Sequence, residues 1–101
     1  MRVIARKRLE EFSRRHDKAR IALERWYVLT TQAGWRSIAD VRRTFAHADP
    51  VETASGRTAT VFNICGNDYR LIVALHYHTG RVYIMRFLTH AEYDKDGWKD
   101  E

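Results

Sequence analysis

The sequence predicts an α+β domain in which helices come first and an antiparallel sheet follows. Between residues 6 and 45, apolar residues recur at spacings of three and four, as on one face of a helix. Beyond Pro50 the spacing changes, and stretches rich in β-branched and aromatic residues, separated by tight-turn signals, predict strands. The 101 residues suit a single domain, residues 1–101, with one modest core.

The helical half contains three amphipathic segments. The first covers residues 6–15, after a short β-branched stretch at residues 2–5 that suits a strand. Asp17 has the side chain of an N-cap for a second helix, and Gly34 is expected to end that helix. Ser37 begins a short third helix whose apolar residues share one face.

Three strands joined by two tight turns are expected in the second half. The first turn consists of residues that tolerate positive φ. On the central strand, Leu71 and Val73 point to one face and provide core material, whereas Arg70 points to the other. The strands cover residues 58–65, 69–78 and 82–88, and the turns are Gly66-Asn67 and Thr79-Gly80.

Charge and composition favour a polyanionic partner. The 18 Lys and Arg exceed the 13 Asp and Glu, for a net charge of +5. Such a surplus attracts nucleic acid, although a solvated basic face gives the same count. The single cysteine, Cys65, excludes an intrachain disulfide, and His76 and His78 without a third ligand are a weak metal signal. Without a signal peptide or a membrane-spanning stretch, a soluble cytoplasmic protein is expected.

Arg70 stands in the middle of the predicted sheet, where an unpaired charge is costly. Arg70 either pairs with an acidic residue inside the fold or binds an anionic ligand from outside. The excess of Lys and Arg over Asp and Glu favours the anionic ligand. A basic run at residues 6–8 stands at a helix start, where the helix dipole disfavours cations. A phosphate-binding role for Lys7 and a solvated basic face both fit that placement.

The segment after the last strand, residues 89–94, contains groups that can move protons. His90 is a histidine, the side-chain type that most often serves as general acid or base, and Tyr93 lies three residues on, on the same side of a short helix. Thr89 and Glu92 also have the spacing of a capping box, so the alternative is a simple helix start with a surface histidine. Three aspartates of the polar tail are expected to be solvated: Asp94, Asp96 and Asp100.

These residues resemble a known family. The stretches FNICGNDYRLI, VYI and LTHAEYDK follow VIARKRLEEF, LERWY, ADVRRTF and AHADPV in the order and register of the HigB toxins. HigB toxins are RelE-like members of type II toxin–antitoxin systems, and the likeness covers nearly the whole chain. It implies that helices pack on one face of a curved antiparallel sheet.

The resemblance implies an mRNA endonuclease that acts on ribosome-bound message and is neutralised by an antitoxin with a helix-turn-helix DNA-binding domain. It implies no metal or cofactor, because the ribose 2′-hydroxyl attacks the neighbouring phosphate while the site moves protons and stabilises a charged phosphorane. Arg70 would stabilise that charge, and His90 and Tyr93 would transfer protons or position the reacting groups. The residues expected to bind RNA are Asn67, Lys7, Arg86 and Lys95.

Met85 departs from the family pattern, which places an arginine directly after the VYI run. The next residue is Arg86, and neighbours on a regular strand face opposite sides. Only a β-bulge would turn Arg86 toward Arg70, and the loss of one charge-stabilising donor typically costs about 10²–10³ in rate. The alternative functions are therefore a catalytically weakened RNA- or ribosome-binding module and a structural partner of the antitoxin.

Overall fold

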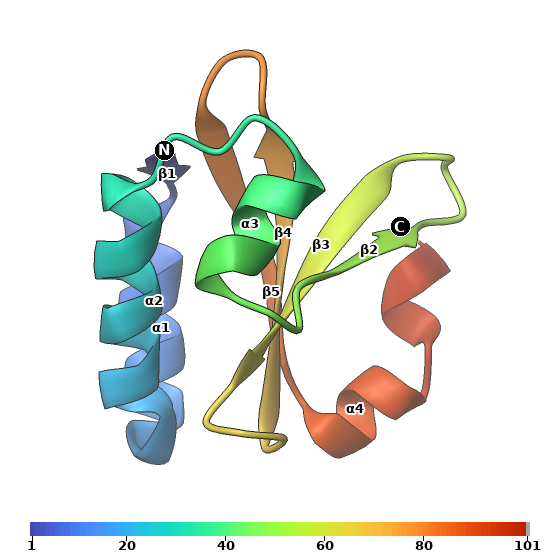
Figure 1. The fold of residues 1–101 in the computed structure, drawn as a ribbon. Coiled ribbons are helices and arrows are strands. Elements are labelled where there is room, and N and C mark those ends of the chain that lie inside the picture. The colour runs from blue at the N-terminus through green and yellow to red at the C-terminus, as the bar shows by residue number, and fades with distance from the viewer. Residues whose placement is uncertain (101) are drawn as a thin grey trace.

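A five-stranded sheet carries the helices of this chain in the computed structural model, which describes residues 1–100 (Figure 1). Among these residues, no helix reaches the length and apolarity that crossing a bilayer requires. The order of helices before the main strands confirms the α+β prediction. The elements are β1 (Arg2–Ile4), α1 (Arg6–Arg15), the 3₁₀ helix η1 (Asp17–Ala19), α2 (Arg20–Gln32), α3 (Ile38–Thr44), β2 (Asp49–Glu52), β3 (Thr58–Ile64), β4 (Tyr69–His76), β5 (Arg81–Thr89), α4 (His90–Asp94) and the 3₁₀ helix η2 (Gly97–Asp100).

The strands follow the order β1-β5-β4-β3-β2. From β2 to β5 each strand pairs antiparallel with the next in the chain, as in the expected meander. The short β1 pairs with β5 in parallel, with Val3 opposite Val82, so the sheet is mixed rather than wholly antiparallel. No hairpin turn joins β1 to β5, because three α-helices, one 3₁₀ helix and three strands lie between them in the chain, and this long connection permits the parallel direction.

The helical half follows the sequence prediction with two differences. Asp17 begins η1 rather than capping α2, because the chain makes a 3₁₀ turn before the α-helix starts. Gly34 does not end α2, since the helix stops earlier and its C-cap, Ala33, is extended with φ −85° and ψ 154°. Ser37 is the N-cap of α3 as expected, although its side chain makes no capping hydrogen bond.

The strands contain one element that the sequence did not predict. β2 forms at the sheet edge although it contains Pro50, which an edge strand tolerates because one row of its N–H groups has no partner strand. The turn between β3 and β4 also differs from expectation. Cys65 and Gly66 take positive φ, at 56° and 66°, and Asn67 does not. The two residues with left-handed backbone are therefore Cys65 and Gly66, one position earlier than the predicted pair Gly66-Asn67.

The main core lies between the sheet and helices α1–α3. Trp26 of α2 and Phe62 of β3 are each 1% exposed, and their rings meet edge to face at 5.5 Å. Leu71 and Val73 of β4 are fully buried in the same cluster, as the strand alternation predicted. Burial of a side chain of this size stabilises the fold by about 1.5–3 kcal/mol. This layer fixes β4 and sends the intervening residues, including Arg70, to the other face.

The C-terminal segment covers part of that other face. Trp98 of η2 is 4% exposed and packs in a second cluster with Ile72 of β4. The backbone N–H of Ala54, in the β2–β3 loop, donates to the carbonyl of Lys99 at 2.8 Å and ties η2 to the sheet. In Figure 1, α4 and η2 stand across the sheet from α1 and α2. The tail is therefore a packed element that carries α4, and not a wholly solvated extension.

Candidate active site

Arg70 lies at the centre of the candidate site and is 8% exposed. Its Nη1 donates to the carbonyl oxygens of Asn67 and Tyr69 at 3.1 and 3.0 Å. Its Nη2 donates to Oδ1 of Asn67 at 3.2 Å and to Nδ1 of His90 at 3.0 Å. The sequence left open an acidic partner or an anion from outside, and all four of these acceptors are neutral. A nearly buried guanidinium with neutral partners keeps its charge available to an approaching anion.

The β3–β4 turn supplies two of these acceptors. Because Cys65 and Gly66 take positive φ, both oxygens of Asn67 face the guanidinium. The turn is held from η1 by an ion pair of 2.5 Å between Lys18 Nζ and Asp68 Oδ2, and the hydrogen bond from Lys18 lowers the pKa of Asp68. Asn67 therefore orients Arg70 through its two oxygens.

His90 connects Arg70 to a carboxylate. A guanidinium only donates, so Nδ1 of His90 must accept and the ring proton of the neutral imidazole must sit on Nε2. Nε2 lies 3.1 Å from Oδ2 of Asp94, one turn along α4, and donates to it. Asp94 is solvated as the sequence predicted, since its side chain is 61% exposed, and it also contacts the imidazole. The three side chains form a directed chain of hydrogen bonds from Arg70 through His90 to Asp94.

Tyr93 forms the floor beneath the guanidinium. Cζ of Arg70 lies 5.7 Å from the centroid of the Tyr93 ring, and that ring stacks on Trp98 at 5.3 Å. Burial raises the pKa of Tyr93, and the negative charge of Asp49 raises it further. The pKa therefore lies above the ordinary value of about 10, so the phenol keeps its proton at neutral pH. Tyr93 can donate a hydrogen bond or a proton but is not suited to act as a base.

Thr89 and Glu92 form the capping box that their spacing predicted. Oγ1 of Thr89 accepts from the backbone N–H of Glu92 at 3.2 Å, and Oε1 of Glu92 accepts from that of Thr89 at 2.9 Å. The second bond lowers the pKa of Glu92. The N–H of His90 donates to the carbonyl of Asp68 at 3.0 Å, which joins α4 to the β3–β4 turn. The capping box that starts α4 therefore also fixes the position of His90. A helix start at Thr89 and a functional role for His90 are compatible.

Replacing Thr89 by alanine is expected to lower the free energy of unfolding by about 0.5–2 kcal/mol, because one orphan N–H of α4 loses its acceptor. Any activity that depends on His90 should fall as well, since α4 would fray at its first turn. A denaturant titration followed by an activity assay on the folded protein measures both effects. Thr79→Ala, in an exposed turn, is the matched control and should change neither quantity.

A β-bulge places Arg86 on the same face as Arg70. The pairing of β4 with β5 skips Met85, which is an extra residue on β5. Beyond it, Arg86 lies opposite Ile72, and opposed residues share a face of the sheet. Ile72 and Arg70 also share a face, and Met85 packs there too, in the cluster around Trp98. The cation expected from the family pattern is therefore present on this face, one residue later in the sequence.

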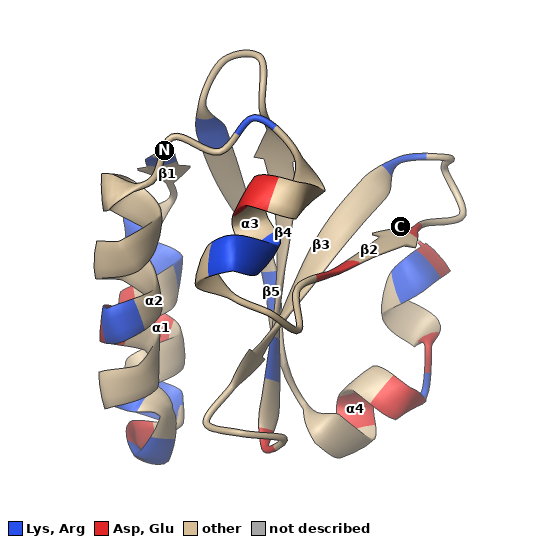
Figure 2. Cartoon of the chain, in the orientation of Figure 1, with Lys and Arg blue, Asp and Glu red and all other residues tan. Residues whose placement is uncertain are grey.

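The basic run at the start of α1 reaches the sheet through a different residue from the one predicted. Lys7 is exposed on the helix surface. Its neighbour Arg8 donates from Nη1 to the carbonyl of Ile84 at 3.1 Å, at the edge of β5. Arg8 and Arg86 together line an open hollow of about 430 Å³ beside the bulge. Figure 2 shows Lys and Arg positions both on α1 and in the central strands.

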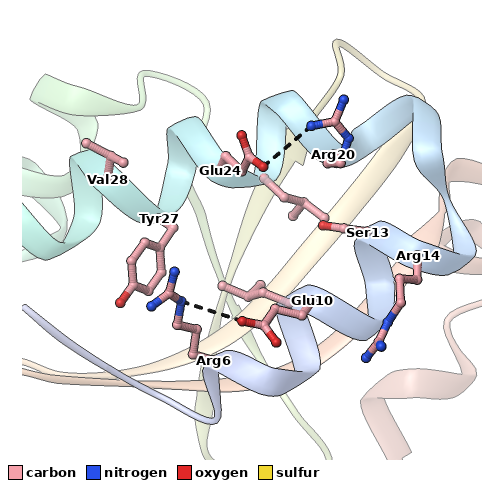
Figure 3. A pocket seen from close by; sticks show the side chains of 10 residues that line it. Arg6, Glu10, Ser13, Arg14, Arg20, Glu24, Tyr27 and Val28 are labelled. Carbon is pink, nitrogen blue, oxygen red and sulfur yellow. Dashed lines mark ion pairs between the residues drawn. The ribbon is translucent and has the colours of Figure 1, made fainter.

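A separate hollow between α1 and α2 lies on the helical layer (Figure 3). Two of its three arginines face carboxylates or rings. Arg6 lies 3.9 Å from Glu10, and its guanidinium lies 4.7 Å from the centroid of the Tyr27 ring. Arg20 lies 3.7 Å from Glu24. This hollow is lined by residues of α1 and α2 alone, and none of the residues of the Arg70 cluster lines it.

The structure joins four of the predicted site residues in direct contact, which are Arg70, Asn67, His90 and Tyr93. Lys95 is exposed at the C-cap of α4 and stands outside these contacts. Three residues were missed, and one of them is Arg8, which reaches the edge of β5. Asp94 had a usable signal, since it lies four residues after His90 on a helix. Asn63 lies opposite Arg70 on β3, and only the register of the hairpin identifies it.

One comparison with known proteins identifies the family. The HigB_toxin family model, described as the RelE-like toxic component of a toxin–antitoxin system, matches residues 19–96. This range includes β3, β4, β5 and α4, and therefore Arg70 and every residue in contact with its guanidinium. No curated protein is a significant match to the chain. The chain belongs to the HigB family of RelE-like toxins, the toxic components of toxin–antitoxin systems.

Proposed function

We propose that this toxin is a metal-independent endoribonuclease that cleaves ribosome-bound mRNA in the cytoplasm. The observation that carries the proposal is the cluster in which Arg70 contacts Asn67, His90 and Tyr93 at once. The cluster combines a nearly buried cation, an oriented imidazole and a protonated phenol. Transesterification at a phosphodiester requires charge stabilisation and two proton transfers, and these groups can supply them.

In the proposed reaction, the ribose 2′-oxygen attacks the adjacent phosphorus and the bond to the 5′-oxygen breaks. The products are a 2′,3′-cyclic phosphate and a 5′-hydroxyl. The scissile phosphate competes for Nη2 of Arg70, which at present bonds Nδ1 of His90. When Arg70 turns to the phosphate, Nδ1 is released and can accept the 2′-hydroxyl proton, while Asp94 stabilises the imidazolium that forms. Tyr93 is the donor available to the leaving 5′-oxygen or to a phosphate oxygen.

The family implies an antitoxin partner. We infer that this partner has a helix-turn-helix DNA-binding domain and silences the toxin by blocking RNA from the Arg70 cluster. The net charge of +5 supports attraction of RNA and of an acidic protein alike. Arg8, Arg86 and Lys95 are candidates for phosphate contacts along the RNA strand, and Lys7 is a more peripheral one.

A non-catalytic RNA-binding module is the second candidate. The observation that favours it is the saturation of the Arg70 terminal nitrogens by four internal acceptors, which RNA must displace before cleavage. The β-bulge at Met85 favours the endoribonuclease hypothesis, because it leaves Arg86 on the same face of the sheet as Arg70. Only the endoribonuclease would produce a 2′,3′-cyclic phosphate, so this product distinguishes the two functions.

The purified toxin is expected to shorten mRNA in a translating extract and to leave 2′,3′-cyclic phosphate ends, because the nucleophile is the ribose 2′-oxygen. Primer extension locates the cuts, and ligation by an enzyme that requires cyclic phosphate identifies the ends. The same reaction without ribosomes tests the dependence on translation. Intact message together with salt-sensitive RNA binding would assign the chain to the non-catalytic class instead.

A further inference from the structure

A larger open hollow, of about 1030 Å³, lies on the sheet face that carries Arg70. It is bounded by the β2–β3 loop on one side and by β4 and β5 on the other. Tyr83 lies opposite Ala74, which alternates onto the face of Arg70, so its side chain belongs to the same surface. Met85 lines both this hollow and the smaller one beside Arg86, so the two are contiguous.

An aromatic pair stands in the hollow. The rings of His76 and Tyr83 meet edge to face, with centroids 4.9 Å apart and an interplanar angle of 67°. Tyr83 is half-buried and His76 is exposed, so Tyr83 is anchored in the sheet while its ring borders open space. Rings held in this way are the platforms on which proteins stack the bases of single-stranded nucleic acid, and every base has a face that can stack.

The opposite wall of the hollow is polar and ordered. The β2–β3 loop closes through a hydrogen bond from the N–H of Thr53 to the carbonyl of Arg57 at 2.8 Å. Oγ1 of Thr53 also donates to that carbonyl at 3.1 Å and lies 3.0 Å from Oγ of Ser55. Arg57 is exposed at this wall, and none of the residues that line the hollow is acidic. The wall therefore offers one cation and several hydroxyl groups to an anionic ligand.

We propose that this hollow is a nucleotide-binding subsite, in which a base stacks on Tyr83 and a neighbouring phosphate contacts Arg57. The inference rests on the proposed function, because it assigns the hollow to the same RNA strand that reaches Arg70. Ala74 is four residues from Arg70 on β4, which corresponds to about 13 Å along a strand. The subsite is thus far enough from the scissile phosphate to hold a different nucleotide. Arg86 and Met85 line the path between the two positions.

Tyr83→Ala is expected to weaken the binding of a single-stranded 2′-O-methyl oligoribonucleotide, which cannot be cleaved, by between about 5-fold and about 100-fold, as the loss of one stacked base predicts. Fluorescence anisotropy measures the affinity, and the KM for cleavable RNA should rise more than kcat falls. Tyr83→Phe keeps the stacking ring and should bind as the unaltered toxin does. Arg57→Ala should weaken binding and reduce its salt dependence. Tyr27→Ala, which removes an aromatic ring from the helical layer, is the matched control.

A second measurement does not depend on the folding of a variant. The unaltered toxin, irradiated with RNA that contains 5-iodouridine, should form a crosslink that mass spectrometry locates at Tyr83 or His76. If the toxin cleaves RNA but Tyr83→Ala keeps its affinity and KM, the subsite is overturned and the proposed function stands. If the toxin neither binds nor cleaves RNA, both fail. Loss of antitoxin binding in Tyr83→Ala with unchanged RNA affinity would show that the hollow is a protein-docking site.

Discussion

Arg70→Ala is expected to lower the rate of the proposed RNA cleavage by at least about 10²–10³-fold, because it removes the donor fork that the proposed mechanism assigns to the developing phosphorane charge. The structure adds a second reason. Nη2 of Arg70 holds Nδ1 of His90 at 3.0 Å, so the variant also releases the imidazole from its position. Single-turnover cleavage of RNA under saturating toxin measures the chemical step directly, and growth arrest after induction in cells measures its consequence.

The same variant tests whether activity is lost through unfolding. Removal of the guanidinium leaves acceptors on Asn67 and Tyr69 without their donor, which costs about 1–3 kcal/mol for a buried group. Denaturant titration must therefore accompany the assay. Arg70→Lys keeps the charge but not the fork, and is expected to recover only part of the rate. Arg43→Ala removes an arginine whose side chain is 83% exposed and should leave the rate unchanged. A folded Arg70→Ala toxin that still cleaves RNA would remove Arg70 from the chemistry.

His90→Ala is expected to lower the cleavage rate by about 10²–10⁴-fold, the range typical for the loss of a general acid or base. The hydrogen bonds of His90 predict a signature beyond the loss itself. Protonation of Nδ1 would set it against the N–H groups of Arg70, so the active form is the neutral ring, and cleavage should decline toward acidic pH. A pH–rate profile should lose this acidic limb in His90→Ala.

Asp94→Asn tests the contribution of Asp94 to the orientation and charge of His90 separately from proton transfer by His90 itself. The amide keeps the shape of the side chain but removes the negative charge beside Nε2 of His90, so the imidazolium loses its stabilisation. Its rate should fall less than that of His90→Ala, while the acidic limb of the profile is retained. Asp96→Asn is the matched control, because Asp96 pairs with Lys99 at 3.2 Å and not with the imidazole. Equal rates for Asp94→Asn and the unaltered toxin would mean that the His90–Asp94 contact has no part in catalysis.

Much of this arrangement could be predicted from the sequence, because it depends on local patterns. The alternation along β4 sent Leu71 inward and Arg70 to the other face, and the TxxE spacing gave the start of α4. The remainder depends on contacts between distant segments. No periodicity shows that the pairing of β4 with β5 skips Met85, since a bulge is a property of two strands. The packing of Trp98 was not predicted either, because its partner Ile72 lies 26 positions earlier in the chain.

The bulge on β5 has a consequence for how variation in this family is interpreted. Because Met85 and Arg86 both reach the same face, a chain could exchange the order of the two residues and still present an arginine on the face of Arg70. A comparison by a single aligned column would score this chain as lacking the arginine, whereas the strand pairing shows the cation on the same face of the sheet.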